Sequence, residues 1–279
     1  MTTALTIRRA TTTLPLSSGL MVLFLVALGW FYSFMQLITL DLVGSLSEAG
    51  PGMQMFAAIQ YYLLNNPLSF ETSLNFCTTT NTNWDILDFV KSFAMWVAMV
   101  AAMMLPNLFP LLRSVKIRGQ KAIPFVLGYF AIWSGFCMLG VSVQWALRML
   151  DVLNGHMVIT NPIVSATVLC VAGTYQLSKH KSARLKERKN LMLITDLKPC
   201  CQTVETASGT AYGLACVRCC FPLMLTMFAF GLMNILAMAM LTVMMILETN
   251  PYSRINLEKI WGGVMCTMGL LFYVQSIWV

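Results

Sequence analysis

The chain has 279 residues, of which 58% are hydrophobic and 10% are charged. Soluble domains carry about 25% charged residues, so this composition excludes an ordinary soluble domain and indicates an integral membrane protein. The formal net charge is +7, but no basic patch with interleaved aromatic residues accompanies it, so we expect no nucleic-acid partner. The sequence predicts a single all-α domain, a polytopic membrane helix bundle.

Six apolar stretches are long enough to cross a membrane, because about 20 residues span the hydrocarbon core. The first follows Arg8 and Arg9 and is too long for the core of a signal peptide, so we interpret it as a retained helix. The six predicted spans cover residues 19–43, 86–112, 122–147, 158–177, 221–247 and 259–278.

The basic residues between these spans predict the orientation of the chain. The segments 1–18, 113–121 and 178–220 hold all but four of the 18 Lys and Arg residues. The four exceptions are Lys91, Arg148, Arg254 and Lys259. Since cytoplasmic loops are enriched in Lys and Arg, we predict these segments and both termini on the cytoplasmic side of a bacterial inner membrane.

Two of the predicted connections are long. The outer one, residues 44–85, has a loose amphipathic pattern, which fits an interfacial helix on the outer leaflet or a short helix packed over the bundle. The inner one, residues 178–220, begins with the basic stretch KHKSARLKERKN, which is typical of a solvated helix near anionic lipid headgroups. We therefore expect membrane lipids among the partners of the chain.

The second span contains the methionine-rich stretch MWVAMVAAMMLP, residues 95–106. Met95, Met99 and Met103 recur at every fourth position and fall along one helix face. Pro106 is expected to kink the inner end of this helix. Thioethers are soft ligands that favour Cu(I), but methionine also fills gaps between packed helices. The sequence leaves both interpretations open for Met99 and Met103.

The fifth span predicts a second methionine stripe. Met233, Met240 and Met244 are expected on one face, with Glu248 at the outer end of the span. The pattern Met-x3-Met-Met occurs in the second and fifth spans, so we also consider two inverted three-helix halves. Asn234 lies deep in the predicted hydrocarbon region, where polar side chains face the bundle. We expect an interhelical hydrogen bond or a role in transport for this amide.

Three cysteines come just before the fifth span, in the stretch CVRCCFPLM. Thiols three residues apart on a helix can converge on one ion, and a helix N-terminus favours the thiolate. The paired C-x-x-C of a zinc ribbon does not occur in the sequence. Buried cysteines that pack a helix end are the alternative. The candidate metal ligands are Cys216, Cys219, Cys220, Met99, Met103, Met233, Met240 and Met244.

No catalytic constellation accompanies these residues. The sequence has no Gly-rich phosphate loop, no H-E-x-x-H and no G-x-S-x-G motif. Its two histidines, His156 and His180, fall on opposite sides of the predicted membrane. We therefore expect no enzymatic activity from this chain alone.

The stretches FAMWVAMVAAMMLP, AGTYQLSKHK and CVRCCFPLMLTMFAFGLMN resemble a bacterial family of predicted metal-binding integral membrane proteins, a domain of unknown function. The A-M-M-x-P motif of the family falls on residues 102–106, its tyrosine-glutamine-leucine stretch on residues 175–177 and its C-x-x-C-C cluster on residues 216–220. A cysteine pair that many members carry after the tyrosine-glutamine-leucine stretch is replaced here by KSARLKERKN. The resemblance implies a helical membrane protein that binds a metal.

Three functions remain open from the sequence. The first is a membrane protein that binds or handles Cu(I) through Met and Cys ligands. The second is a non-catalytic accessory subunit of a larger membrane metalloenzyme, in which methionine-rich faces pack against other subunits. The third is a transporter of a small molecule or ion, which the inverted repeat and Asn234 support.

Overall fold

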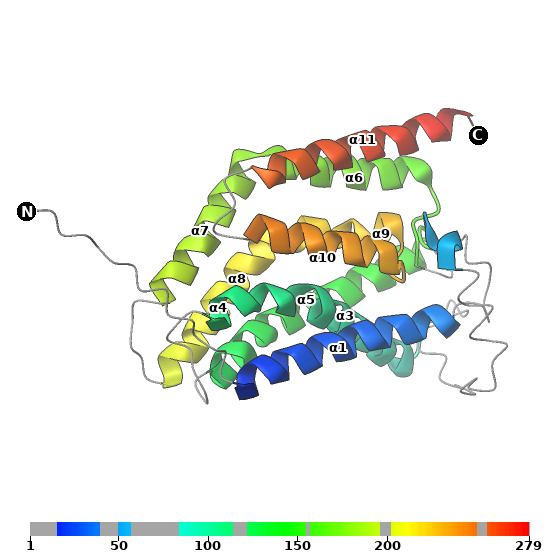
Figure 1. The fold of residues 1–279 in the computed structure, drawn as a ribbon. Helices are drawn as coiled ribbons and strands as arrows, with labels where there is room; N and C mark the ends of the chain where they lie inside the picture. Colours follow the sequence, from blue (N-terminus) through cyan, green and yellow to red (C-terminus); the bar gives the residue numbers. More distant parts are fainter. Residues whose placement is uncertain are drawn as a thin grey trace, which may run out of the picture.

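The structure is a computed structural model that describes residues 16–39, 50–56, 84–113, 122–154, 157–195, 202–249 and 256–278. In these ranges the chain is helical, and the only β pairing is an isolated antiparallel bridge between Leu153 and Ile159. Figure 1 shows long helices lying side by side, with α7 running along one end of the bundle. The prediction of an all-α bundle is therefore confirmed.

The elements follow the chain in a simple order. They are α1 (Leu16–Thr39), a 3-10 helix (Met53–Phe56), α3 (Ile86–Met104), a second 3-10 helix (Leu105–Leu108), α4 (Phe109–Arg113), α5 (Ala122–Met149), α6 (Pro162–Leu177), α7 (Lys179–Thr195), α8 (Gln202–Leu225), α9 (Met227–Phe230), α10 (Ile235–Thr249) and α11 (Leu257–Trp278). The interfacial helix predicted within residues 44–85 lies for the most part outside the described residues.

Five described stretches are long and apolar enough to cross a membrane, and α6 and α10 are shorter apolar helices. The five stretches are Gly19–Gln36, Ile86–Leu108, Ile123–Met149, Thr206–Phe230 and Leu257–Trp278. The buried share is 72% for the stretch in α8 but 17% for the stretch in α11. The outer helices α1 and α11 expose large apolar side chains, including Phe24, Phe31, Leu271 and Ile277. The bundle thus has an inner helix, α8, and an apolar outer surface that suits lipid.

Helix α3 begins at a capping box and ends at the predicted kink. The side chain of Asp85 accepts a hydrogen bond from the backbone N–H of Ile86 at 2.8 Å, and the side chain of Asp88 accepts one from the backbone N–H of Asp85 at 3.3 Å. The helix stops at Met104, and Pro106 lies in the 3-10 turn that follows. Because proline lacks a backbone N–H, it cannot make the helical hydrogen bond at its own position. The α-helix thus changes to a 3-10 turn at Pro106, where the sequence predicted a kink.

Small residues allow three helix pairs to approach closely. A Cβ added to Gly29 would lie 2.7 Å from the carbonyl oxygen of Ala98, which joins α1 to α3. A Cβ on Gly173 would lie 2.6 Å from the sulfur of Cys266, which joins α6 to α11. A Cβ on Gly209 would overlap the backbone of α5. Packing through small residues is characteristic of membrane helix bundles.

The largest difference from the predicted topology lies in residues 202–249. The sequence predicted a loop up to residue 220 and one span at 221–247, whereas the structure has α8, α9, a break and α10. Gly231 occupies the break with φ 101°, a conformation that glycine adopts at little cost. The predicted loop and span were wrong because the first half of α8 is rich in Ala, Gly, Ser and Thr. Such residues suit a helix inside a bundle but give only a weak hydropathy signal.

The additional helix changes the side on which the described chain ends. In Figure 1 the start of α1 and the start of α11 lie at the end of the bundle that α7 covers, whereas the end of α11 lies at the opposite end. Glu248, predicted at the outer end of its span, forms an ion pair with Lys181 of α7. The described ends of the chain therefore lie at opposite ends of the bundle, whereas the sequence predicted both termini on one side of the membrane.

The charge asymmetry remains after this correction. Lys91 is near the start of α3 and Arg148 near the end of α5, at the end of the bundle away from α7. The basic residues in or near the elements at the α7 end are Arg113, Lys179, Lys181, Arg184, Lys186, Arg188, Lys189 and Lys259. The α7 end is thus the basic end of the described chain.

Candidate metal-binding site

The three cysteines lie inside helix α8, whereas the sequence predicted them at the start of a span. The predicted effect of a helix N-terminus on their thiols therefore does not apply. The side chains of Cys216, Cys219 and Cys220 are each no more than 1% exposed, and all three are free thiols. Cys216, Cys219 and Cys220 stand at positions i, i+3 and i+4 of the helix, so they are neighbours along it. We call these three residues the thiol cluster.

Pro222 lies inside α8, just after the thiol cluster. Proline has no backbone N–H, so the carbonyl of Arg218, four residues earlier, loses its helical partner. The hydroxyl of Tyr175 donates a hydrogen bond to that carbonyl at 2.8 Å. Tyr175 belongs to the tyrosine-glutamine-leucine stretch at the end of α6. This stretch therefore holds α6 against the helix that carries the cysteines.

A buried ion pair lies beside the thiol cluster. Lys181 Nζ is 2.9 Å from Glu248 Oε2, and the two side chains are 0% and 1% exposed. Lys181 also donates to the carbonyl of Cys219 at 3.0 Å, and the Gln176 amide donates to Glu248. Burial by itself lowers the pKa of Lys181, but Cys219 and Glu248 together with Cys220 raise this pKa above its usual value. Lys181 is thus a fixed positive charge, and Glu248 is its counter-ion.

Arg188 follows two turns later on the same buried side of α7 and is 2% exposed. Its Nε donates to the hydroxyl of Tyr212 at 3.2 Å, and its Nη1 lies 3.8 Å from the sulfur of Cys220. Its Nη2 has no hydrogen-bond partner in the described part of the chain. No carboxylate among the described side chains lies within ion-pair distance of the guanidinium. Arg188 is therefore buried against a sulfur atom, and no carboxylate that the structure describes pairs with it.

Tyr129 of α5 connects the thiol cluster to the methionine-rich segment. Its hydroxyl lies 3.3 Å from the sulfur of Cys216 and donates to the carbonyl of Met104 at 3.2 Å. The side chain of Asn107 donates to the carbonyl of Met103 at 3.2 Å. Both carbonyls lie where α3 gives way to the 3-10 turn. The A-M-M-x-P motif thus brings an irregular backbone segment next to the thiol cluster.

The structure divides the predicted methionine ligands into a buried group and one outward-facing residue. The buried ones are Met99, Met103, Met233 and Met244. Met240 is 36% exposed, so it does not share a buried face with Met244. Met233 precedes the first residue of α10, and helical spacing does not apply across the break. The three predicted stripe residues thus differ in exposure, and Met233 lies outside the helix that carries Met240 and Met244.

Asn234 closes the break between α9 and α10. Its side-chain oxygen accepts a hydrogen bond from the backbone N–H of Ala237 at 3.0 Å, as a helix cap does. Its amide nitrogen donates to the carbonyl of Phe230 at 3.1 Å and to the carbonyl of Pro51 at 3.0 Å. These neutral contacts give the buried amide a structural role.

Sequence reasoning missed Lys181, Arg188 and Tyr129. The two cations belong to a run of basic residues that looked uniformly solvated. Lys181, Leu185 and Arg188 recur at the spacing of one helix face, and all three are buried. This spacing was the sequence signal that one face of the basic helix is buried, because a helix solvated on all sides would not show it. Tyr129 gave no signal, because an aromatic residue in an apolar span is ordinary.

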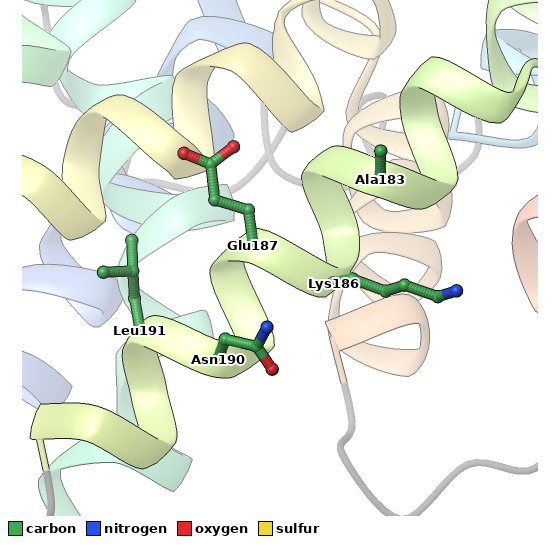
Figure 2. Close-up of a pocket in the computed structure, with 5 residues that line it drawn as sticks. All are labelled: Ala183, Lys186, Glu187, Asn190 and Leu191. Atoms are coloured by element: carbon green, nitrogen blue, oxygen red, sulfur yellow. The ribbon is translucent and has the colours of Figure 1, made fainter.

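An open hollow of about 470 Å³ lies on α7 and is lined by Ala183, Lys186, Glu187, Asn190 and Leu191. Figure 2 shows the side chains of Lys186 and Glu187 leaving α7 in different directions. The lining contains no thiol and no thioether, so it offers no soft ligand for copper.

The donor chemistry of the thiol cluster fits a soft ion with few ligands. Among the described residues, no group of three or more His, Cys, Asp or Glu side chains is arranged to hold a metal ion. Structural zinc requires a tetrahedral set of four ligands, so the cluster does not fit zinc. Cu(I) is stable with a pair of sulfur ligands, and thiolates and thioethers select it.

Comparison with known proteins places this arrangement in a family. Residues 93–272 match the family PpoB2, described as a copper chaperone. The match extends from α3 into α11 and includes the thiol cluster, Arg188 and Glu248. No curated protein and no solved structure matches the chain. The resemblance to a metal-related family is confirmed, and the chain belongs to the PpoB2 family of copper chaperones.

Proposed function

We propose that this chain is a membrane-embedded copper chaperone that holds Cu(I) at the thiol cluster and passes it to a partner protein. The observation that carries the proposal is the burial of three adjacent thiols beside two buried cations in a chain of a copper chaperone family. Cysteine thiolate is a soft ligand that selects Cu(I) over hard ions such as Mg²⁺ or Ca²⁺.

The apolar helices and the distribution of charge support a place in the bacterial inner membrane. Five stretches are long enough to cross it, and large apolar side chains cover the outer helices. By the positive-inside rule the basic α7 end faces the cytoplasm. The thiol cluster then lies near the cytoplasmic side, and the end of α11 lies on the other side.

The buried methionines take a secondary place in this proposal. Met99, Met103, Met233 and Met244 supply neutral thioethers, which are soft but carry no charge to hold a cation. Thiolates supply both softness and charge. We therefore assign the main binding energy to the thiol cluster and a weak auxiliary contribution to the thioethers. Met240 faces outward and takes no part.

A chaperone needs a protein that receives its copper. The chain lacks catalytic motifs, so the chemistry that uses copper belongs to another protein. We propose a copper-containing membrane enzyme as the recipient, with this chain as its non-catalytic accessory protein. This role combines the copper-handling and accessory-subunit interpretations of the sequence.

The test is the copper content of the purified full-length chain. The protein in detergent is loaded with Cu(I) under reducing conditions, and bound copper is measured per chain. Cys216→Ser, Cys219→Ser and Cys220→Ser together are expected to abolish stoichiometric binding, because serine keeps the size but loses the soft sulfur. Cys137→Ser is the matched control, since Cys137 is a buried free thiol on α5. Equal copper in the triple variant and the control would disprove the proposed site.

A further inference from the structure

We propose that the thiol cluster takes a soft monovalent cation as an anionic dithiolate complex and that Arg188 is the counter-ion of this complex. The inference rests on the proposed function, because it concerns the same site. It goes beyond the proposed function in two ways. It specifies the charge of the ion that the site accepts, and it assigns Arg188, which lies outside the cysteine motif, as a positioning residue.

Of the two buried cations of α7, only Lys181 has a carboxylate partner among the side chains that the structure describes. Lys181 is paired with Glu248 in the interior, and Arg184 is paired with Glu187 at the surface. A guanidinium keeps its proton in proteins, and an uncompensated buried charge is strongly destabilising. The buried Arg188 therefore needs an anion close by.

The contacts of Arg188 direct it at the thiol cluster. Its Nη1 lies 3.8 Å from the sulfur of Cys220, which follows Cys216 by four residues and Cys219 by one residue in α8. The ring and hydroxyl of Tyr212 hold the guanidinium, with 5.3 Å from its carbon to the ring centre. The Nη2 group has no hydrogen-bond partner in the described part of the chain. The guanidinium beside the thiol cluster thus keeps an unused hydrogen-bond donor for a bound anionic complex.

Counting charges then specifies the ion. Cu(I) bound by two thiolates forms a complex with a single negative charge, and Arg188 neutralises it. A divalent ion with two thiolates is already neutral, which leaves Arg188 without a counter-ion. A divalent ion would need a third thiolate to reach the same charge, and among the described residues no three such side chains are arranged around one ion. Ag(I) has the charge and softness of Cu(I), so the same site should accept it.

The first experiment measures Cu(I) affinity by competition with a Cu(I) chelator, using the full-length chain in detergent. Arg188→Met removes the charge with an apolar side chain of similar length, and we expect about a tenfold or larger loss of affinity. Arg188→Lys keeps a charge and should recover most of that loss. Arg184→Met, one turn earlier on α7 and exposed, is the matched control and should bind as the wild type does. Wild-type affinity in a folded Arg188→Met variant would overturn the inference.

The second experiment uses the wild-type chain loaded with Cu(I), so it does not depend on any variant folding. Ag(I) should displace the bound copper, whereas Zn(II) at the same concentration should not. Displacement by Zn(II) would overturn the inference even if copper binding itself is confirmed. Absence of Cu(I) binding to the wild-type chain would overturn the proposed function and this inference with it.

Discussion

Backbone groups lose their helical partners at two places, at Pro222 inside α8 and at the break between α9 and α10, and different chemistry surrounds the two places. After the thiol cluster, Pro222 frees a carbonyl beside a region that holds the buried cations Lys181 and Arg188. At Gly231 to Asn234, an amide and backbone groups close the gap, and the side chain of Asn234 contacts only the neutral backbone groups of Pro51, Phe230 and Ala237 among the described residues. The surroundings of Pro222 are therefore charged and rich in sulfur, whereas the contacts of Asn234 at the break are neutral.

This difference separates a structural break from a candidate binding site. Both regions contain buried polar groups, and the family motifs include both. Hydrogen bonds among neutral groups satisfy the break at Gly231, so nothing there requires a ligand. Beside the thiol cluster, Arg188 has no carboxylate in the described chain. An unbalanced buried charge, and not a helix break as such, therefore distinguishes the region that we propose as the binding site.

The largest expected effect concerns the two ends of the bundle and is all-or-none. Reporter fusions at residue 190 in α7 and after residue 278 should report opposite sides of the membrane, because these positions lie at opposite ends of the bundle. A fusion after Arg113 serves as the control and should report the same side as residue 190. If the fusions at residues 190 and 278 report the same side, the six-span topology predicted from the sequence would hold instead.

The buried ion pair is expected to make the largest contribution to stability. Glu248→Gln leaves Lys181 without a counter-ion in the interior, which should lower the free energy of unfolding by about 3–5 kcal/mol. Thermal or denaturant unfolding in detergent measures this change. Glu187→Gln is the matched control, because its exposed pair with Arg184 should contribute no more than about 1 kcal/mol. Equal effects of the two substitutions would contradict the burial of the Lys181–Glu248 pair.

A smaller effect is expected at the neutral break. Asn234→Ala removes the cap of α10 and leaves the carbonyls of Phe230 and Pro51 without the amide, so stability should fall by about 1–3 kcal/mol. Copper bound per chain should stay at the wild-type value. Loss of copper from a folded Asn234→Ala variant would show that the two regions are not separate in function.

The smallest effect is expected in the methionine core. Met99→Leu with Met103→Leu conserves volume and hydrophobicity, and each such exchange usually changes stability by less than about 1.5 kcal/mol. We expect stoichiometric copper to remain, with affinity lowered by no more than a few fold. Met240→Leu, at an outward-facing position, should leave affinity unchanged. Complete loss of copper from the first variant at an unchanged melting temperature would move the main site from the thiols to the thioethers.

The sequence by itself determined the features that depend on local chemistry. Apolar length and low charge predicted a helical membrane bundle, and Pro106 predicted the kink, because proline disrupts helical hydrogen bonding wherever it occurs. The C-x-x-C-C spacing identified Cys216, Cys219 and Cys220 as candidates, because thiols at that spacing lie on adjoining faces of a helix. These inferences required only neighbours along the chain.

Only the tertiary structure decided which distant groups meet. The pairing of Lys181 with Glu248 depends on α10 returning to the α7 end, which follows from a break that hydropathy did not predict. The burial of Arg188 depends on which face of α7 packs against α8, and the exposure of Met240 depends on the packing of α10. Helical periodicity places a residue on a face, but the neighbouring helices decide whether that face is buried and which charge lies opposite it.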